Sequence, residues 1–154
     1  RQFFGGKPVA IAGVVEELRK RGPRIEVVLD DDSGRISVGF FDAGHGMAVG
    51  GDYKQPLLEG VNGARTADGG ATWQPASVLP TGYMSVVMPV PGTSQALVAG
   101  GLAGSGYSVD GGRSWTVLDR TPINTVGFAN PATGWAVGPK GLLMKYSGPA
   151  LDGR

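Results

Sequence analysis

The chain of 154 residues contains no cysteine and a single histidine. The lack of cysteine excludes disulfides, thiolate metal sites and thiol nucleophiles, and one histidine alone cannot form a histidine metal site. No run of 18 apolar residues occurs, so we expect no membrane span. The 14 basic and 13 acidic side chains nearly cancel, so overall charge does not attract nucleic acid. Composition therefore predicts no metal and no cofactor.

Glycine is the residue present in excess, at 28 of 154 positions, against a usual share of about 7%. These glycines separate short apolar runs, a pattern typical of an all-β chain with many tight turns. The chain begins "RQFFGGKP", without an initiator Met or an apolar signal segment, which suggests a processed or excised piece.

The N-terminal part predicts a three-stranded meander. Apolar residues alternate over 25–29 and again over 36–40, which is the period of half-buried strands. "DDDSG" between them is a turn sequence. Its D-x-D-x-G (Asp30, Asp32, Gly34) also starts some calcium loops, but the downstream Glu and the third oxygen ligand are missing, so a solvated turn is favoured.

The rest of the chain repeats. "TADGGATW" (66–73) matches "SVDGGRSW" (108–115), and "VGFFDAGHGMAVG" (38–50) matches "VGFANPATGWAVG" (126–138), with a looser copy over 84–101. A period of about 40–45 residues is typical of β-propeller blades. We therefore expect an all-β fold with about three antiparallel four-stranded blades that share a strand with the preceding meander. The expected divisions are a meander at 1–35, a partial propeller at 36–150 with blades at about 36–79, 84–120 and 123–147, and a tail at 151–154.

A further internal match concerns closure of the last repeat. "RIEVVLD" (24–30) is similar to "RSWTVLD" (113–119), and the third repeat has only three expected strands. Residues 24–30 are therefore expected to complete the third blade, with residues 8–18 as an extra edge. Three blades do not close a ring, since closed propellers need about four or more. The preferred prediction is a homo-oligomer, a dimer forming a six-bladed ring.

Two family resemblances follow from these residues. Residues 38–147 resemble the Asp-box (BNR, sialidase-type) repeats, most closely the photosystem-assembly-factor-like propellers. Residues 6–41 resemble the first three strands of OB-fold domains such as the RecG wedge and the replicative polymerase alpha subunit. The Asp-box pattern S/T-x-D-x-G-x-S/T-W is complete twice, at Thr66, Asp68, Gly70, Thr72 and Trp73, and at Ser108, Asp110, Gly112, Ser114 and Trp115.

These motifs favour structural over catalytic roles. A turn carboxylate accepts backbone N–H bonds, a glycine supplies the left-handed residue, and the Trp residues, with Trp135, pack between blades. His45 has no triad partners and is interpreted as a turn residue. Beyond the N-terminal segment there is one Glu, and nothing obliges Arg65, Arg113, Arg120 and Arg154 to converge, so no catalytic residue is predicted and glycosidase activity is not expected.

The leading functional prediction is a non-catalytic binding or assembly scaffold that self-associates. A second is single-stranded nucleic-acid binding through the OB-like loop, whose basic run is Arg19, Lys20, Arg21 and Arg24. No aromatic residue lies between residues 5 and 39 to stack bases, and the aspartates nearby offset the charge. A third is a chain recombined from two unrelated folds, without an evolved activity.

Overall fold

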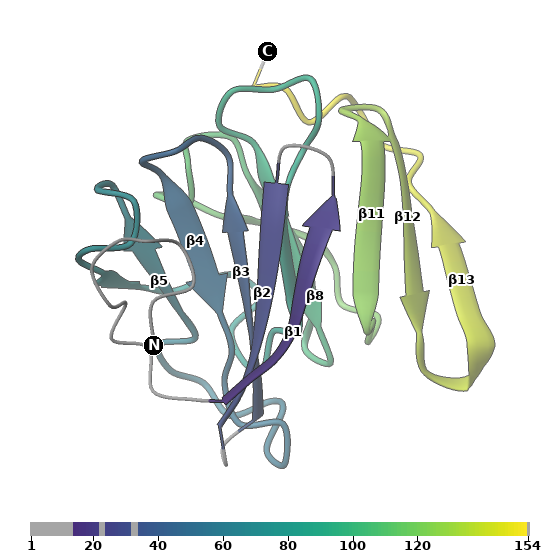
Figure 1. Ribbon diagram of the computed structural model, residues 1–154. Coiled ribbons are helices and arrows are strands. Elements are labelled where there is room, and N and C mark those ends of the chain that lie inside the picture. The colour runs from purple at the N-terminus through teal and green to yellow at the C-terminus, as the bar shows by residue number, and fades with distance from the viewer. Residues whose placement is uncertain (1–13, 22–23, 32–33, 154) are drawn as a thin grey trace.

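The computed structural model describes residues 14–21, 24–31 and 34–153, and for residues 14–35 the description is limited to the backbone. The described chain is all-β, as the sequence predicts, and its strands form three antiparallel sheets (Figure 1). A single short 3₁₀ turn at Pro139–Gly141 is the helical element within the described ranges. That part of the chain holds no helix with the length and apolar character that crossing a bilayer demands.

The first sheet has six strands in chain order, each hydrogen-bonded to the next. It contains the N-terminal meander and the whole first repeat, so the expected division at residue 35 falls inside β3. Its strands are β1 (Val14–Arg21), β2 (Arg24–Asp31), β3 (Gly34–Phe40), β4 (Gly46–Val49), β5 (Gly63–Thr66) and β6 (Gln74–Ala76).

The second and third repeats form one sheet each. The second sheet has four strands and the third has three. These strands are β7 (Val86–Pro89), β8 (Leu97–Gly101), β9 (Gly104–Ser108), β10 (Thr116–Asp119), β11 (Thr125–Asn130), β12 (Thr133–Gly138) and β13 (Leu142–Lys145).

The sheets are layered, with the second sheet between the other two (Figure 1). One core joins the first sheet to the second and contains Met47, Val87 and Leu97. Another joins the second sheet to the third and contains Val98 and Phe128. Leu151, placed in a tail by the sequence prediction, is buried in this second core. Each interface therefore depends on apolar residues that alternate along short strands.

The three sheets repeat the same cross-strand positions. Arg65 and Tyr107 are equivalent, because each directly precedes the first residue of an Asp box. The residues opposite them on the neighbouring strand, Met47 and Val98, are therefore equivalent as well. The match of residues 38–50 to 126–138, at an offset of 88 positions, makes Trp135 the equivalent of Met47. The three equivalent pairs are Met47 with Arg65, Val98 with Tyr107, and Trp135 with Lys145.

The N-terminal strands do not complete the third sheet, so that expectation is wrong. β2 pairs with β1 and with β3, where Val27 lies opposite Val38 and Leu29 opposite Ile36. β13 pairs with β12 and is an edge strand. The extra strand expected at residues 8–18 is β1, which runs from Val14 to Arg21 in the described part of the chain.

Candidate functional site

The first Asp box is a turn closed by its own side chains. The Thr66 hydroxyl donates to Asp68 Oδ1 at 2.9 Å and accepts the Gly70 N–H at 2.8 Å. Asp68 also accepts the Thr72 N–H at 2.9 Å and the Thr72 hydroxyl at 2.6 Å. The Trp73 indole N–H donates back to the Gly70 carbonyl at 3.1 Å. Gly70 has a φ of +91°, which a residue with a side chain rarely adopts.

The second Asp box has the same hydrogen bonds. The Ser108 hydroxyl donates to Asp110 and accepts from Gly112, both at 2.8 Å. Asp110 accepts from the Ser114 N–H and hydroxyl, and Trp115 Nε1 donates to the Gly112 carbonyl at 3.2 Å. The geometry thus supports the interpretation of these residues as parts of turns.

The turn carboxylates are held in the anionic form. Hydrogen bonds from the side chain and backbone of Thr72, and from Thr66, lower the pKa of Asp68 from 3.8 to about 2. Burial raises the pKa of Asp110, but hydrogen bonds from Ser114 and Ser108 outweigh it and bring this pKa to about 2 as well. Each carboxylate is therefore charged, and satisfied within its own turn, at neutral pH.

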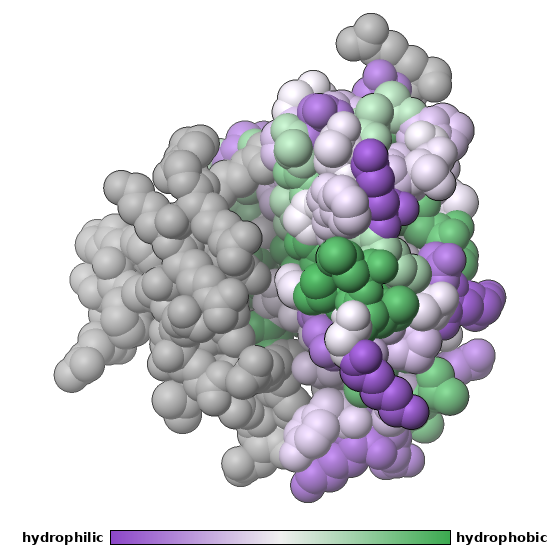
Figure 2. Space-filling view, turned by 90° about the vertical axis from the view of Figure 1, so that its right-hand side faces the viewer, coloured by the Kyte–Doolittle hydropathy of each residue, from purple (hydrophilic) through white to green (hydrophobic). Residues whose placement is uncertain are grey.

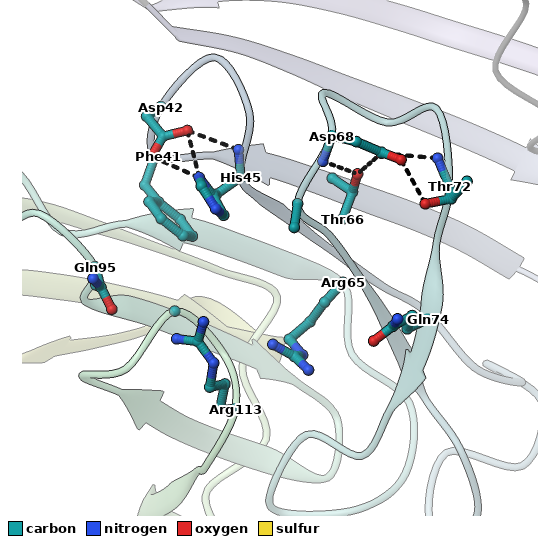
Figure 3. A pocket seen from close by; sticks show the side chains of 12 residues that line it. Phe41, Asp42, His45, Arg65, Thr66, Asp68, Thr72, Gln74, Gln95 and Arg113 are labelled. Atoms are coloured by element: carbon teal, nitrogen blue, oxygen red, sulfur yellow. Dashed lines mark hydrogen bonds and ion pairs between the residues drawn. The ribbon is translucent and has the colours of Figure 1, made fainter.

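A cleft of about 220 Å³ opens between the first and second sheets. Its walls are the β3–β4 loop, the first Asp-box turn, Gln95 of the β7–β8 loop and the second Asp-box turn (Figure 3). The sequence predictions missed this cleft because its walls come from segments far apart in the chain.

Two arginines line the cleft. Arg65 lies on β5 and is half-buried, and a Cβ built on Gly112 would lie 3.4 Å from its Cδ, so its stem packs on the second Asp-box turn. Arg113 lies in that turn, and its NH1 donates to the Asp110 carbonyl at 2.9 Å. The sequence gives no reason for these arginines to converge, yet Figure 3 shows their guanidinium groups turned toward the same space.

His45 also lines the cleft, on the β3–β4 loop. Its Nδ1 bonds Asp42 at 2.9 Å, and its ring stacks on Phe41 with centroids 5.7 Å apart. The His45 bond and the Gly44 backbone N–H lower the pKa of Asp42. Within the described chain no hydroxyl bonds His45, and no three His, Cys, Asp or Glu residues gather as a metal site. The groups present can bind a ligand by charge and hydrogen bonds.

The predicted basic run lies on strands, not in a loop. Arg19, Lys20 and Arg21 are the last residues of β1, and Arg24 begins β2 opposite Arg21. Residues 22–23 lie outside the described residues, as does Asp32 of the acidic turn. Nucleic-acid binding through this hairpin stays a prediction.

The outer face of the third sheet is uncovered by any described segment. It carries Trp135, Val137 and Leu143, with exposed fractions of 47%, 40% and 62%. Figure 2, which views this side, shows apolar atoms gathered near its centre. Lys145 Nζ lies 5.6 Å from the centroid of the Trp135 ring. The equivalent residues of the other two sheets, Met47 and Val98, are fully buried.

Comparison with protein-family models, with curated proteins and with solved structures gives no match for this chain.

Proposed function

We propose that the protein is a non-catalytic binding scaffold of β-propeller-type sheets, and that it binds a second copy of itself through the outer face of the third sheet. One observation carries this proposal: the same repeat position is covered by a neighbouring sheet in the first two repeats and uncovered in the third. Met47 packs under the second sheet and Val98 under the third. Trp135 at that position is about half exposed.

The uncovered face has the chemistry of a sheet interface. Val137 lies opposite Leu143, and Trp135 lies opposite Lys145, so the apolar side chains form one contiguous patch across β12 and β13. Fully burying each large apolar side chain stabilises a complex by about 1.5–3 kcal/mol before the costs of association. A partner sheet with the same residues would bury this patch on both sides.

The opposite end of the stack favours a face-to-face pair over a ring. Val38 and Ala48, which pair on the other face of the first sheet, are only 3% and 8% exposed. A head-to-tail ring of two chains would need that face for contact with the third sheet of the partner. An isologous dimer uses the third-sheet face of both copies and requires no such access.

Size-exclusion chromatography with light scattering tests the pairing. The parent is expected at twice the mass of its 15.8 kDa chain. Leu143→Glu is expected to run as a monomer, because it places two carboxylates at the centre of the contact. Leu57→Glu is the matched control, since Leu57 is 72% exposed in the β4–β5 loop. A parent that stays monomeric, or a control that dissociates as Leu143→Glu does, would overturn the proposal.

A further inference from the structure

The arginines of the cleft are not part of the repeat. The residue equivalent to Arg65 is Tyr107 in the second sheet and Lys145 in the third. The residue equivalent to Arg113 in the first Asp box is Ala71. The Asp-box turns have the same hydrogen bonds with either residue, so folding of the turn does not require Arg113. Their placement in one cleft therefore needs a different explanation.

Among the described residues, neither guanidinium forms an ion pair with a carboxylate. Within the described ranges, no carboxylate oxygen lies within 4 Å of Arg65 or Arg113, and the recorded ion pair joins His45 to Asp42. The two carboxylates in the cleft wall, Asp42 and Asp68, accept hydrogen bonds from their own loops. Arg113 uses one donor on a backbone carbonyl. Two positive charges with spare N–H donors thus line the same cleft.

We propose that this cleft binds a small carboxylate, held by the guanidinium groups of Arg65 and Arg113. Guanidinium forks match the two oxygens of a carboxylate, and such charge-assisted bonds are stronger than hydrogen bonds between neutral groups. Gln74 and Gln95 flank the arginines and supply neutral amides to the rest of the ligand (Figure 3). Asp42 and Asp68 stand in the wall of the cleft and disfavour a dianion such as phosphate by like-charge repulsion. This site is separate from the third-sheet face.

Titration of ¹⁵N-labelled protein with acetate, benzoate and inorganic phosphate, at matched ionic strength, tests the site by NMR. Saturable shifts are expected for the arginine Nε–H signals and the Gly111 and Gly112 amides, with the carboxylates binding more tightly than phosphate. Arg65→Gln and Arg113→Gln are each expected to weaken carboxylate binding by roughly tenfold or more, through loss of a charged hydrogen-bond donor.

Arg120→Gln is the matched control, because Arg120 is exposed and lies outside the cleft lining. It should bind carboxylates as the parent does, and so should Leu143→Glu, whose change lies on another sheet. Since Arg113 is exposed, its variant keeps the test valid even if Arg65→Gln unfolds. Absence of saturable shifts, phosphate binding as tightly as acetate, or an equal loss in Arg120→Gln would each overturn the proposal.

Discussion

At the scale of single residues, each Asp box couples two hydroxyls to one carboxylate. Ser108 is 2% exposed, and its Oγ both donates to Asp110 and accepts the buried Gly112 N–H. The indole of Trp115 then anchors the turn to the same glycine. The aspartate is thus the centre of a closed set of hydrogen bonds within its own turn, which explains how the same motif can recur as a structural unit.

Ser108→Ala is expected to destabilise the protein by about 1–3 kcal/mol, because the Gly112 N–H loses its acceptor and stays buried. Urea unfolding followed by Trp fluorescence measures the change. Ser147→Ala, at an exposed position near the end of the third sheet, should stay within about 0.5 kcal/mol of the parent. Equal effects of the two substitutions would show that the hydroxyl of Ser108 has no structural role.

The lowered pKa of Asp110 predicts how the stability of the fold depends on pH in acid. Its pKa is about 2 in the fold against an ordinary 3.8, so the stability it contributes is complete above about pH 4 and is lost as pH falls toward 2. Asp110→Asn should therefore be less stable at pH 7 and show a shallower loss of stability between pH 4 and pH 2. Urea midpoints across this range measure it. An unchanged slope in the variant would contradict the assignment.

At the scale of elements, the second sheet has no room for a side chain at Gly106 of β9. A Cβ on Gly106 would overlap the Leu79 carbonyl oxygen and approach the Thr116 carbonyl oxygen to 3.1 Å. Thr116 belongs to the neighbouring strand β10, and Leu79 lies in the segment that precedes β7. Glycine at this position is required for close packing of backbone on backbone.

Gly106→Ala is expected to destabilise the fold by about 3 kcal/mol or more, because backbone must move to accept the methyl group. Gly127→Ala on β11 is the control, since a Cβ there meets nothing within 4 Å. It should be neutral or slightly stabilising, as the unfolded chain loses freedom. Thermal unfolding measures the difference in stability between the two variants. Equal stabilities would show that the backbone around β9 can shift to accept the methyl group.

The sequence predicted the elements better than it predicted their partners. Alternating residues and glycine turns predicted an all-β chain, because both signals are local. The prediction that β2 completes the third sheet was wrong. The similarity of residues 24–30 to 113–119 indicates a similar strand, but it does not indicate which strand lies beside it. Because β2 and β3 are close in the chain, pairing them closes a short loop at a small entropic cost. Pairing β2 with β13 would close a loop that contains most of the chain, at a larger entropic cost. Arg65 and Arg113, 48 positions apart (113 minus 65), meet through stacking of sheets, which no local pattern encodes.

At the scale of the whole molecule, the three sheets form a series in which each covers the face of the one before it. The cores between them are separate, one containing Met47 and the other Phe128. A face-to-face pair of copies would add a third core of the same kind between two third sheets.

The proposed pairing would make stability depend on protein concentration. Because a second copy would bind only the folded chain, the Tm of the parent is expected to rise as its concentration is raised from micromolar to hundreds of micromolar. The Tm of Leu143→Glu should not change over that range. Differential scanning calorimetry at several concentrations measures both. A parent Tm that is independent of concentration would be inconsistent with a dimer in that range.

The repeated covering of one face by the next sheet also affects how such a protein can change by duplication. Inserting another copy of the second repeat would bury the outer face of the sheet before it and present the same face again at its own far side. In an open series the number of exposed interfaces is therefore independent of length. Lengthening would move the face proposed for pairing along the molecule and preserve it, so selection could alter the size of such a protein without removing that face.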